Sequence, residues 1–150
     1  PGGGRWTEFL QQRASQRFVL DVSERAIAIC KERFAMALNI QYLIGTGGDI
    51  ALPDRSVDAI WSYDVFVHIN PVDTRSYFRE FARILRPGGY AVIHHPGLPT
   101  SNAIRRQAWR SDVTDDMVRN FATANQLEIV SQTQQHIKAT DMITIMRRPE

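Results

Sequence analysis

The sequence has a single cysteine, no long apolar run and almost no net charge. One cysteine excludes a framework of internal disulfides, and no Cys/His spacing resembles a structural zinc site. No apolar stretch approaches the roughly 18 residues that a membrane span needs, and no signal peptide is visible at the start. We therefore expect a cytoplasmic protein that does not act at a membrane.

The charge and composition also limit the partners. The formal net charge is +2 over 150 residues, with 43% hydrophobic and 23% charged residues, as in ordinary globular domains. The positive charges are dispersed apart from short pairs such as Arg105-Arg106, which favours a solvated surface over a nucleic-acid interface. A chain of this length fits one domain covering residues 1–150.

Apolar runs typical of buried strands alternate along the chain with patterns typical of amphipathic helices. We expect strands over residues 17–22, 40–44, 57–63, 90–95, 127–134 and 138–146. We expect helices over 5–14, after an N-cap at Ser23 as far as Leu38, from Pro71 to a stop at Pro87-Gly88-Gly89, and from Thr114 to about 125. This order predicts an α/β fold: a doubly wound, mostly parallel Rossmann-like sheet with a C-terminal antiparallel hairpin.

The long polar stretch 96–111 stands apart from these elements. A loop of that length in a compact domain is usually functional, so we expect it to act as a lid, with Trp109 helping to close it. His136 is expected on the surface.

The first residues, Pro1-Gly2-Gly3-Gly4, precede a helix-like run, and Asp21 ends an apolar run about 20 residues further on. Glycines allow backbone N–H groups to approach a ligand, and a carboxylate at that spacing can accept the hydroxyls of a ribose. The arrangement predicts a nucleoside site at the carboxyl ends of parallel strands.

Four motifs in order narrow the choice of nucleoside. The turn 1–6, the strand end 20–23, the segment 52–62 and the helix-to-strand turn 85–90 resemble those of the class I S-adenosylmethionine-dependent methyltransferases. The resemblance covers nearly the whole chain, and it implies S-adenosylmethionine as the cofactor.

The resemblance also assigns roles to residues. Gly2 and Gly4 would lie under the methionine part of the cofactor, and Asp21, followed by Val22, would bind the ribose diol. The adenine would be bordered by Gly48, Asp49 and Ile50, and the sulfonium end by Ser62, Tyr63 and Asp64. In this family a central strand ending in an acid precedes the glycine turn, and the sequence begins after both. We therefore expect the first central strand to be absent from this chain, and a homodimer that exchanges segments is one way to cover the open sheet.

Three histidines follow predicted strands at the edge where an acceptor would lie: His68, His94 and His95. A base is needed only when the acceptor holds its proton tightly, as a sugar hydroxyl does. We expect His68 and His95 to serve, with His94 pointing away because side chains alternate along a strand. A loop-anchoring hydrogen bond is the alternative for His68. No spacing of these histidines with Asp64 requires a metal, so no metal site is expected.

The sequence thus predicts an S-adenosylmethionine-dependent methyltransferase for a small-molecule acceptor, with O-methylation of a sugar or similar hydroxyl preferred. One alternative is a methyltransferase-like domain without catalytic activity. Another is an NAD-dependent dehydrogenase that uses the same glycine turn and Asp21, although the turn 85–89 and the lack of a Tyr-x-x-x-Lys pair argue against it.

Overall fold

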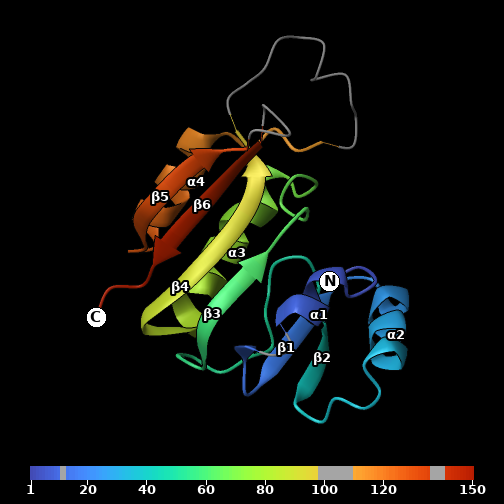
Figure 1. The fold of residues 1–150 in the computed structure, drawn as a ribbon. Coiled ribbons are helices and arrows are strands. Elements are labelled where there is room, and N and C mark those ends of the chain that lie inside the picture. The colour runs from blue at the N-terminus through green and yellow to red at the C-terminus, as the bar shows by residue number, and fades with distance from the viewer. Residues whose placement is uncertain (11–12, 98–109, 136–140) are drawn as a thin grey trace. The chain divides into compact units, whose positions relative to one another are not determined.

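A computed structural model describes residues 1–10, 13–97, 110–135 and 141–150 of the chain (Figure 1). These residues form two compact units, an N-terminal unit, Pro1–Ala51, and a C-terminal unit, Leu52–Glu150, each of which has its own sheet. The expected single domain over 1–150 stays a prediction. Among the helices in the described part of the chain, none has the length and apolar character that a membrane span requires.

The N-terminal unit contains two helices and two strands. In order they are α1 (Arg5–Leu10), β1 (Arg17–Asp21), α2 (Glu24–Arg33) and β2 (Ile40–Ile44). The two strands are parallel and in full register, from Arg17 opposite Ile40 to Asp21 opposite Ile44. Both carboxyl ends are therefore level, and the loops that follow them begin side by side.

Helix α2 covers this pair of strands and supplies most of the unit's core. Ile27, Cys30 and Phe34 are buried against Val19 of β1. The Ser23 hydroxyl caps the helix by accepting a hydrogen bond from the Ala26 N–H (3.3 Å). All of this agrees with the helical spacing seen in the sequence.

Both helices of this unit are shorter than predicted. Helix α2 ends at Arg33, and Leu38, the predicted end of this helix, is exposed because the chain has already turned towards β2. In α1 the buried side chain is Thr7, while Phe9 is exposed.

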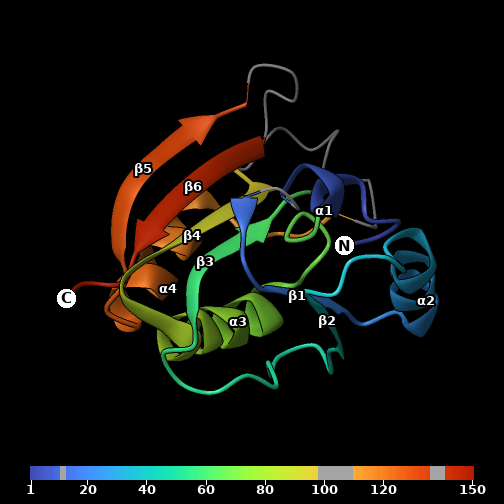
Figure 2. The same ribbon diagram turned by 60° about the horizontal axis from the view of Figure 1, so that its bottom comes forward.

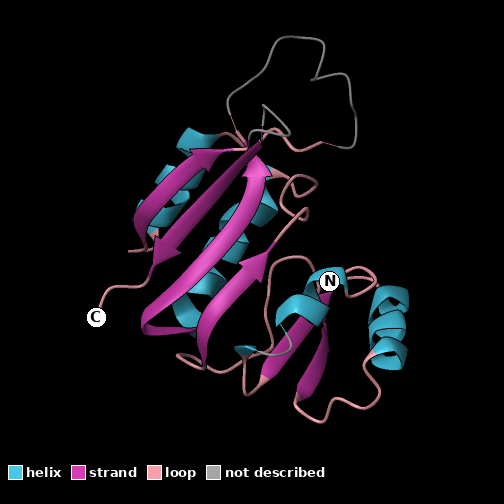
Figure 3. Ribbon diagram, viewed as in Figure 1, coloured by secondary structure: helices cyan, strands magenta, loops and turns pink. Residues whose placement is uncertain are grey.

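The C-terminal unit contains a four-stranded sheet in the order β3-β4-β6-β5 (Figure 3). Its elements are β3 (Val57–Ser62), α3 (Pro71–Ile84), β4 (Leu85–Pro96), α4 (Asp115–Ala124), β5 (Glu128–Gln134) and β6 (Asp141–Arg147). Strands β3 and β4 are parallel, whereas β6 runs antiparallel to both β4 and β5. The expected C-terminal antiparallel hairpin is therefore present at this side of the sheet.

Helices α3 and α4 lie on the same face of that sheet (Figure 2). The apolar stripe of α3 is aromatic: Phe78 and Phe81 are buried, and Phe78 meets Phe121 of α4 edge to face, with ring centroids 5.8 Å apart. On the sheet, Ile93 and Met146 are completely buried. These aromatic residues recur at helical spacing in the sequence, as expected for an amphipathic helix.

The junction between α3 and β4 differs from the predicted turn. The helix ends at Ile84, and the strand begins at the next residue, Leu85, which pairs with Val57. Pairing then resumes between Ala59 and Tyr90, so the Pro-Gly-Gly segment bulges out of the ladder and does not precede it. Gly88 supplies the positive φ, +77°, that this bulge requires.

The α/β class, with parallel strands followed by an antiparallel hairpin, is confirmed. Several predicted features lie outside the described residues: most of the lid (96–111) with Trp109, His136, and the expected start of the last strand.

Candidate functional site

The glycine turn of the N-terminal unit is tightly built. The Gly4 N–H donates to the Pro1 carbonyl (3.0 Å), and both Gly2 (φ +51°) and Gly4 (φ +80°) have left-handed backbone conformations. A Cβ at Gly4 would lie 2.5 Å from Cε2 of Phe34 and 3.2 Å from Sγ of Cys30. Gly4 is therefore fixed by both its backbone angle and its neighbours, whereas a Cβ at Gly2 would meet nothing within 4 Å.

Helix α2 holds the turn from below. The Cys30 thiol donates to the Gly2 carbonyl (3.3 Å), and Nη1 of Arg33 donates to the Gly3 carbonyl (2.8 Å). These bonds hold the Gly2 and Gly3 carbonyls towards the helix, while the Gly2 and Gly4 N–H groups donate within the protein, to Asp21 and Pro1.

Asp21 lies at the end of β1, beside this turn. Its Oδ1 accepts the Ser23 N–H (2.9 Å), its Oδ2 accepts the Gly2 N–H (3.2 Å), and Oδ2 lies 2.9 Å from the Pro1 amine. Burial raises the pKa of the Asp21 carboxyl, but the N–H groups of Ser23 and Gly2, which donate to it, act in the opposite direction, and the pKa lies below the usual 3.8. The side chain is 20% exposed and ionised, so the carboxylate can act as a hydrogen-bond acceptor for a ligand hydroxyl.

The loop after β2 begins next to Asp21. The Gly45 N–H donates to the Asp21 carbonyl (2.9 Å), which joins the two strand ends. Further along, Gly47 has a φ of +99° and Ile50 is buried, while the predicted adenine-side residue Asp49 is exposed. Val22, which follows Asp21, is 62% exposed. The N-terminal unit thus brings the glycine turn, the predicted ribose-binding acid Asp21 and the start of the predicted adenine-side loop to one edge.

In the C-terminal unit, Tyr63 and Asp64 directly follow β3. Ser62 is opposite Ile93, so the next residue of β4, His94, lies beside them. The Tyr63 and His94 rings are stacked, with centroids 4.4 Å apart and planes 14° apart. Asp64 has a φ of +59°, and its N–H donates to Nδ1 of His94 (3.1 Å).

His94 is 1% exposed and links this strand end to the hairpin. Its Nε2 lies 3.2 Å from Oδ2 of Asp141, the fully buried first residue of β6, and Arg110 pairs with the other carboxylate oxygen. Because a backbone N–H can only donate, Nδ1 of His94 accepts, and the ring proton is on Nε2, facing Asp141. The sequence indicated His94 as a strand residue but gave no sign of this buried network.

His95 faces the interior of its unit and not the edge of the sheet. Its Nδ1 is bonded to the Pro96 carbonyl, which can only accept, so Nε2 accepts from the Thr144 hydroxyl (2.7 Å). Burial lowers the pKa of His95 to about 4. With no exposed surface and both ring nitrogens bonded, His95 is poorly placed to reach an acceptor, and the structure does not support its predicted role as a base.

His68 has the most accessible ring among His68, His94 and His95. His68 is an exposed residue in the turn after β3, where its backbone N–H donates to the Val65 carbonyl (2.9 Å). Its role as a base stays a prediction.

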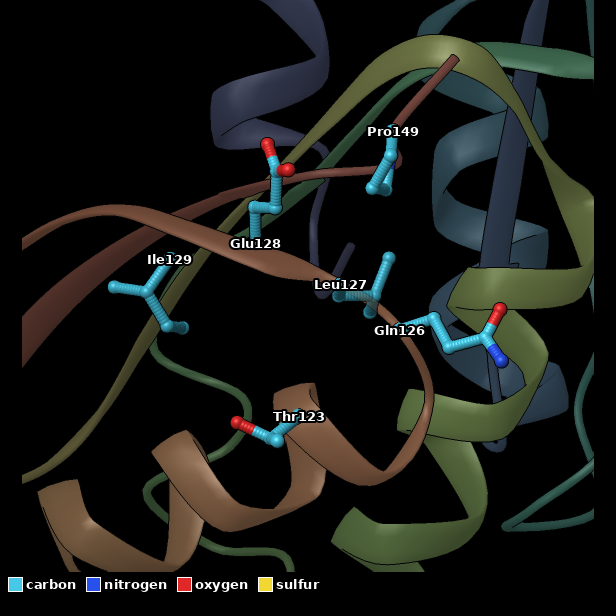
Figure 4. A pocket seen from close by; sticks show the side chains of 6 residues that line it. All are labelled: Thr123, Gln126, Leu127, Glu128, Ile129 and Pro149. Atoms are coloured by element: carbon cyan, nitrogen blue, oxygen red, sulfur yellow. The ribbon is translucent and has the colours of Figure 1, made fainter.

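A hollow of about 590 Å³ is lined by the end of α4, the start of β5 and Pro149 (Figure 4). Glu128, one of the residues that line this hollow, pairs across the sheet with Arg147, and Arg147 pairs on its other side with Tyr90. These three residues lie at the end of the sheet away from Pro96. The hollow is therefore at the opposite end of this sheet from Tyr63 and His94. In the described residues, no group of three His, Cys, Asp or Glu side chains could hold a metal ion.

Comparison with known proteins gives the class of this fold and these motifs. The family described as "Methyltransferase domain" matches residues 1–93. The chain belongs to this methyltransferase domain family. Membership favours the predicted methyltransferase family over the dehydrogenase alternative, and it supports the predicted cofactor, S-adenosylmethionine.

Two curated relatives illustrate the range of the family. The chain is 31% identical over 95 residues to a malonyl-[acyl-carrier protein] O-methyltransferase from a Marinomonas species, which covers 61% of this chain and 34% of that protein. It is 32% identical over 92 residues to a demethylmenaquinone methyltransferase of Tropheryma whipplei, covering 61% and 37%. The matched segment thus spans about a third of the length of these relatives.

Solved structures show the same fold at low identity. A putative sarcosine dimethylglycine methyltransferase from Galdieria sulphuraria aligns with 99% of this chain and 76% of its own, with a TM-score of 0.82 and 19% identity. The [4+2]-cyclase SpnF aligns with 99% and 72%, with a TM-score of 0.83 and 14% identity. At such identities the likeness is one of fold alone.

Proposed function

We propose that this chain is the cofactor-binding part of an S-adenosylmethionine-dependent methyltransferase that acts on a small molecule. Asp21 carries the proposal: an ionised carboxylate at a strand end, bonded by the Gly2 and Ser23 N–H groups and joined through its carbonyl to the loop after β2. In this role Asp21 accepts the two ribose hydroxyls, and the Gly2–Gly4 turn lies against the methionine part. The open space above Gly2 fits such a ligand.

When bound, S-adenosylmethionine supplies an electrophilic methyl group on a sulfonium. The protein's contribution to an in-line displacement is to orient the acceptor and exclude water. Tyr63 and Asp64 line the sulfonium end in this proposal, since an aromatic face and a carboxylate both suit a cation.

The acceptor is a small molecule with a hydroxyl group, a sugar being the preferred class. The exposed His68 would take the hydroxyl proton during transfer. The two curated relatives act, by their names, on a malonyl-acyl-carrier protein and on demethylmenaquinone, so the family accommodates different acceptors. The expected homodimer and cytoplasmic location stay predictions.

Isothermal titration with S-adenosylhomocysteine tests the cofactor site in the protein that contains residues 1–150. We expect wild-type binding, and Asp21→Asn should weaken it about tenfold or more, because a charge-assisted hydrogen bond contributes about 1.5–3 kcal/mol. Glu24→Gln, an exposed acid three residues on, is the matched control and should leave the affinity unchanged. Absence of binding to the wild type would reject the proposal.

A panel of small hydroxyl compounds, including sugars, tests the acceptor class by the release of S-adenosylhomocysteine. With an accepted hydroxyl, His68→Gln should lower kcat by about 100-fold or more while changing KM little, as expected for loss of a general base. An unchanged kcat would exclude His68 from that role.

A further inference from the structure

The carboxyl end of β3 is shaped by a ring from the neighbouring strand. Asp64 is not a glycine, yet its φ is +59°, a region that L-residues adopt at a cost unless the surroundings hold them there. The hydrogen bond from its N–H to Nδ1 of His94 (3.1 Å) stabilises this turn, and the stack of Tyr63 on the same ring holds the preceding residue.

The imidazole is itself fixed from the other side. Nε2 of His94 lies 3.2 Å from Oδ2 of Asp141, and Asp141 is completely buried at the start of β6. Arg110 pairs with Oδ1 of Asp141 and balances its buried charge. A flip of the ring would move Nδ1 away from the Asp64 N–H and Nε2–H away from the carboxylate, so Asp141 determines which nitrogen faces β3.

We propose that His94 is a positioning residue for the cofactor: Asp141 and Arg110 orient its ring, and the ring sets the Tyr63–Asp64 backbone that borders the sulfonium end. The identity of the ligand in this inference rests on the proposed function. The network of Asp64, His94, Asp141 and Arg110 rests on the geometry alone. His94 itself does not touch the reacting atoms.

Two substitutions separate the two contacts of the ring, the hydrogen bond at Nδ1 and the approach of Nε2 to Asp141. In His94→Asn, the amide oxygen takes nearly the place of Nδ1 and can still accept the Asp64 N–H. In His94→Gln, the longer amide can donate towards Asp141 in place of Nε2–H, but no acceptor remains for Asp64. A purely structural role would make both variants lose affinity alike, whereas positioning through Asp64 requires the Asn variant to perform better.

The first readout is hydrogen exchange of the Asp64 amide without any ligand. We expect this amide to be protected in the wild type and in His94→Asn, and to exchange about tenfold faster or more in His94→Gln. A long-range proton–nitrogen spectrum of the wild type should show His94 protonated at Nε2. An unprotected wild-type Asp64 amide, or a proton on Nδ1, would overturn the network.

The second readout is the affinity for S-adenosylhomocysteine. We expect His94→Asn to stay within about threefold of the wild type and His94→Gln to bind about tenfold more weakly, as one lost hydrogen bond implies. Should His94→Gln not fold, Asp141→Asn, which keeps the ring and removes the charge that orients it, should give the weakened binding. Unchanged affinity in the folded variant would overturn the positioning role. If the wild type binds no S-adenosylhomocysteine while the Asp64 amide is protected as expected, the proposed function fails and the network stands.

Discussion

Two adjacent glycines of the N-terminal turn differ in what they can tolerate. Gly4 has a φ of +80°, and a Cβ there would overlap the Phe34 ring at 2.5 Å. Gly3 has no positive φ, and a Cβ there would meet nothing within 4 Å. The pair therefore separates the general cost of ordering a glycine-rich turn from a steric demand at one residue.

Gly4→Ala is expected to lower the free energy of unfolding by about 1–3 kcal/mol, because a left-handed backbone and a ring contact are both violated. Gly3→Ala is the control and should change it by less than about 0.5 kcal/mol. Urea denaturation at pH 7 measures both values. Equal effects of the two substitutions would contradict this account.

Local chemistry made some site residues predictable, while others depend on tertiary contacts. Asp21 could be found because a carboxylate follows a short apolar run at a fixed distance from the glycines. The choice between His94 and His95 could not, because alternation along a strand says only that their rings face opposite sides. The partners that decide it, Thr144 and Asp141, come from β6, almost 50 residues away in the sequence.

At the scale of elements, the helix starts are determined by side chains next to them. Ser23, Asn70 and Thr114 each accept the N–H of the residue three positions on, at 3.3, 2.9 and 3.2 Å. Ser23 and Thr114 could be identified from the sequence as caps. The end of α3 could not be placed, since its last turn leads directly into the pairing of Leu85 with Val57, a contact that depends on the sheet.

The last turn of α3 also holds the segment before β3. Arg83 donates to both carboxylate oxygens of Glu80 (3.0 and 2.6 Å), to Oδ1 of Asp54 (2.8 Å) and to the Leu52 carbonyl (2.7 Å). The bonds to Glu80 and Asp54 raise the pKa of Arg83 above its usual value. One planar guanidinium thus ties a helix to the loop that enters the neighbouring strand.

Arg83→Ala is expected to destabilise the protein by about 2 kcal/mol, mainly because Glu80, 9% exposed, would lose its counter-charge. Arg83→Lys should recover part of this loss, because an ammonium group keeps the charge but cannot form all these bonds at once. Thermal and urea unfolding compare these variants with Arg75→Ala, an exposed arginine of the same helix. Lysine performing as well as arginine would show that charge alone matters.

At the scale of the whole molecule, the order of elements was predictable and the division of the chain was not. Hydrophobic periodicity indicated α/β alternation and the terminal hairpin, since both depend on local spacing. The boundary between Ala51 and Leu52 falls in a loop whose composition resembles any other turn, so no local signal indicates it.

Folding stability is expected to fall in mild acid through the buried His95. Burial lowers its folded-state pKa to about 4 from 6.5, so between these pH values the unfolded chain binds the proton that the folded chain excludes. The free energy of unfolding should therefore fall as the pH falls from 6.5 to 4, by roughly 3 kcal/mol from this residue.

Urea unfolding at several pH values in that window measures the slope. His95→Gln removes the titrating group, so its slope should be smaller than that of the wild type even if it is less stable at pH 7. The same slope in both proteins would assign the acid sensitivity to other groups.

The position of Cys30 makes it possible to measure how often the glycine turn opens. Its thiol, the only one in the chain, is fully buried under the turn and donates to the Gly2 carbonyl, and burial raises its pKa. A thiol reagent can therefore modify Cys30 only in the fraction of molecules whose turn has opened, so the labelling rate reports that opening equilibrium. If S-adenosylhomocysteine binds only molecules with a closed turn, it lowers the fraction with an open turn, so the labelling rate should fall as the ligand concentration rises. Gly4→Ala should speed it, and an unaltered rate with bound ligand would show that the ligand does not act on this turn.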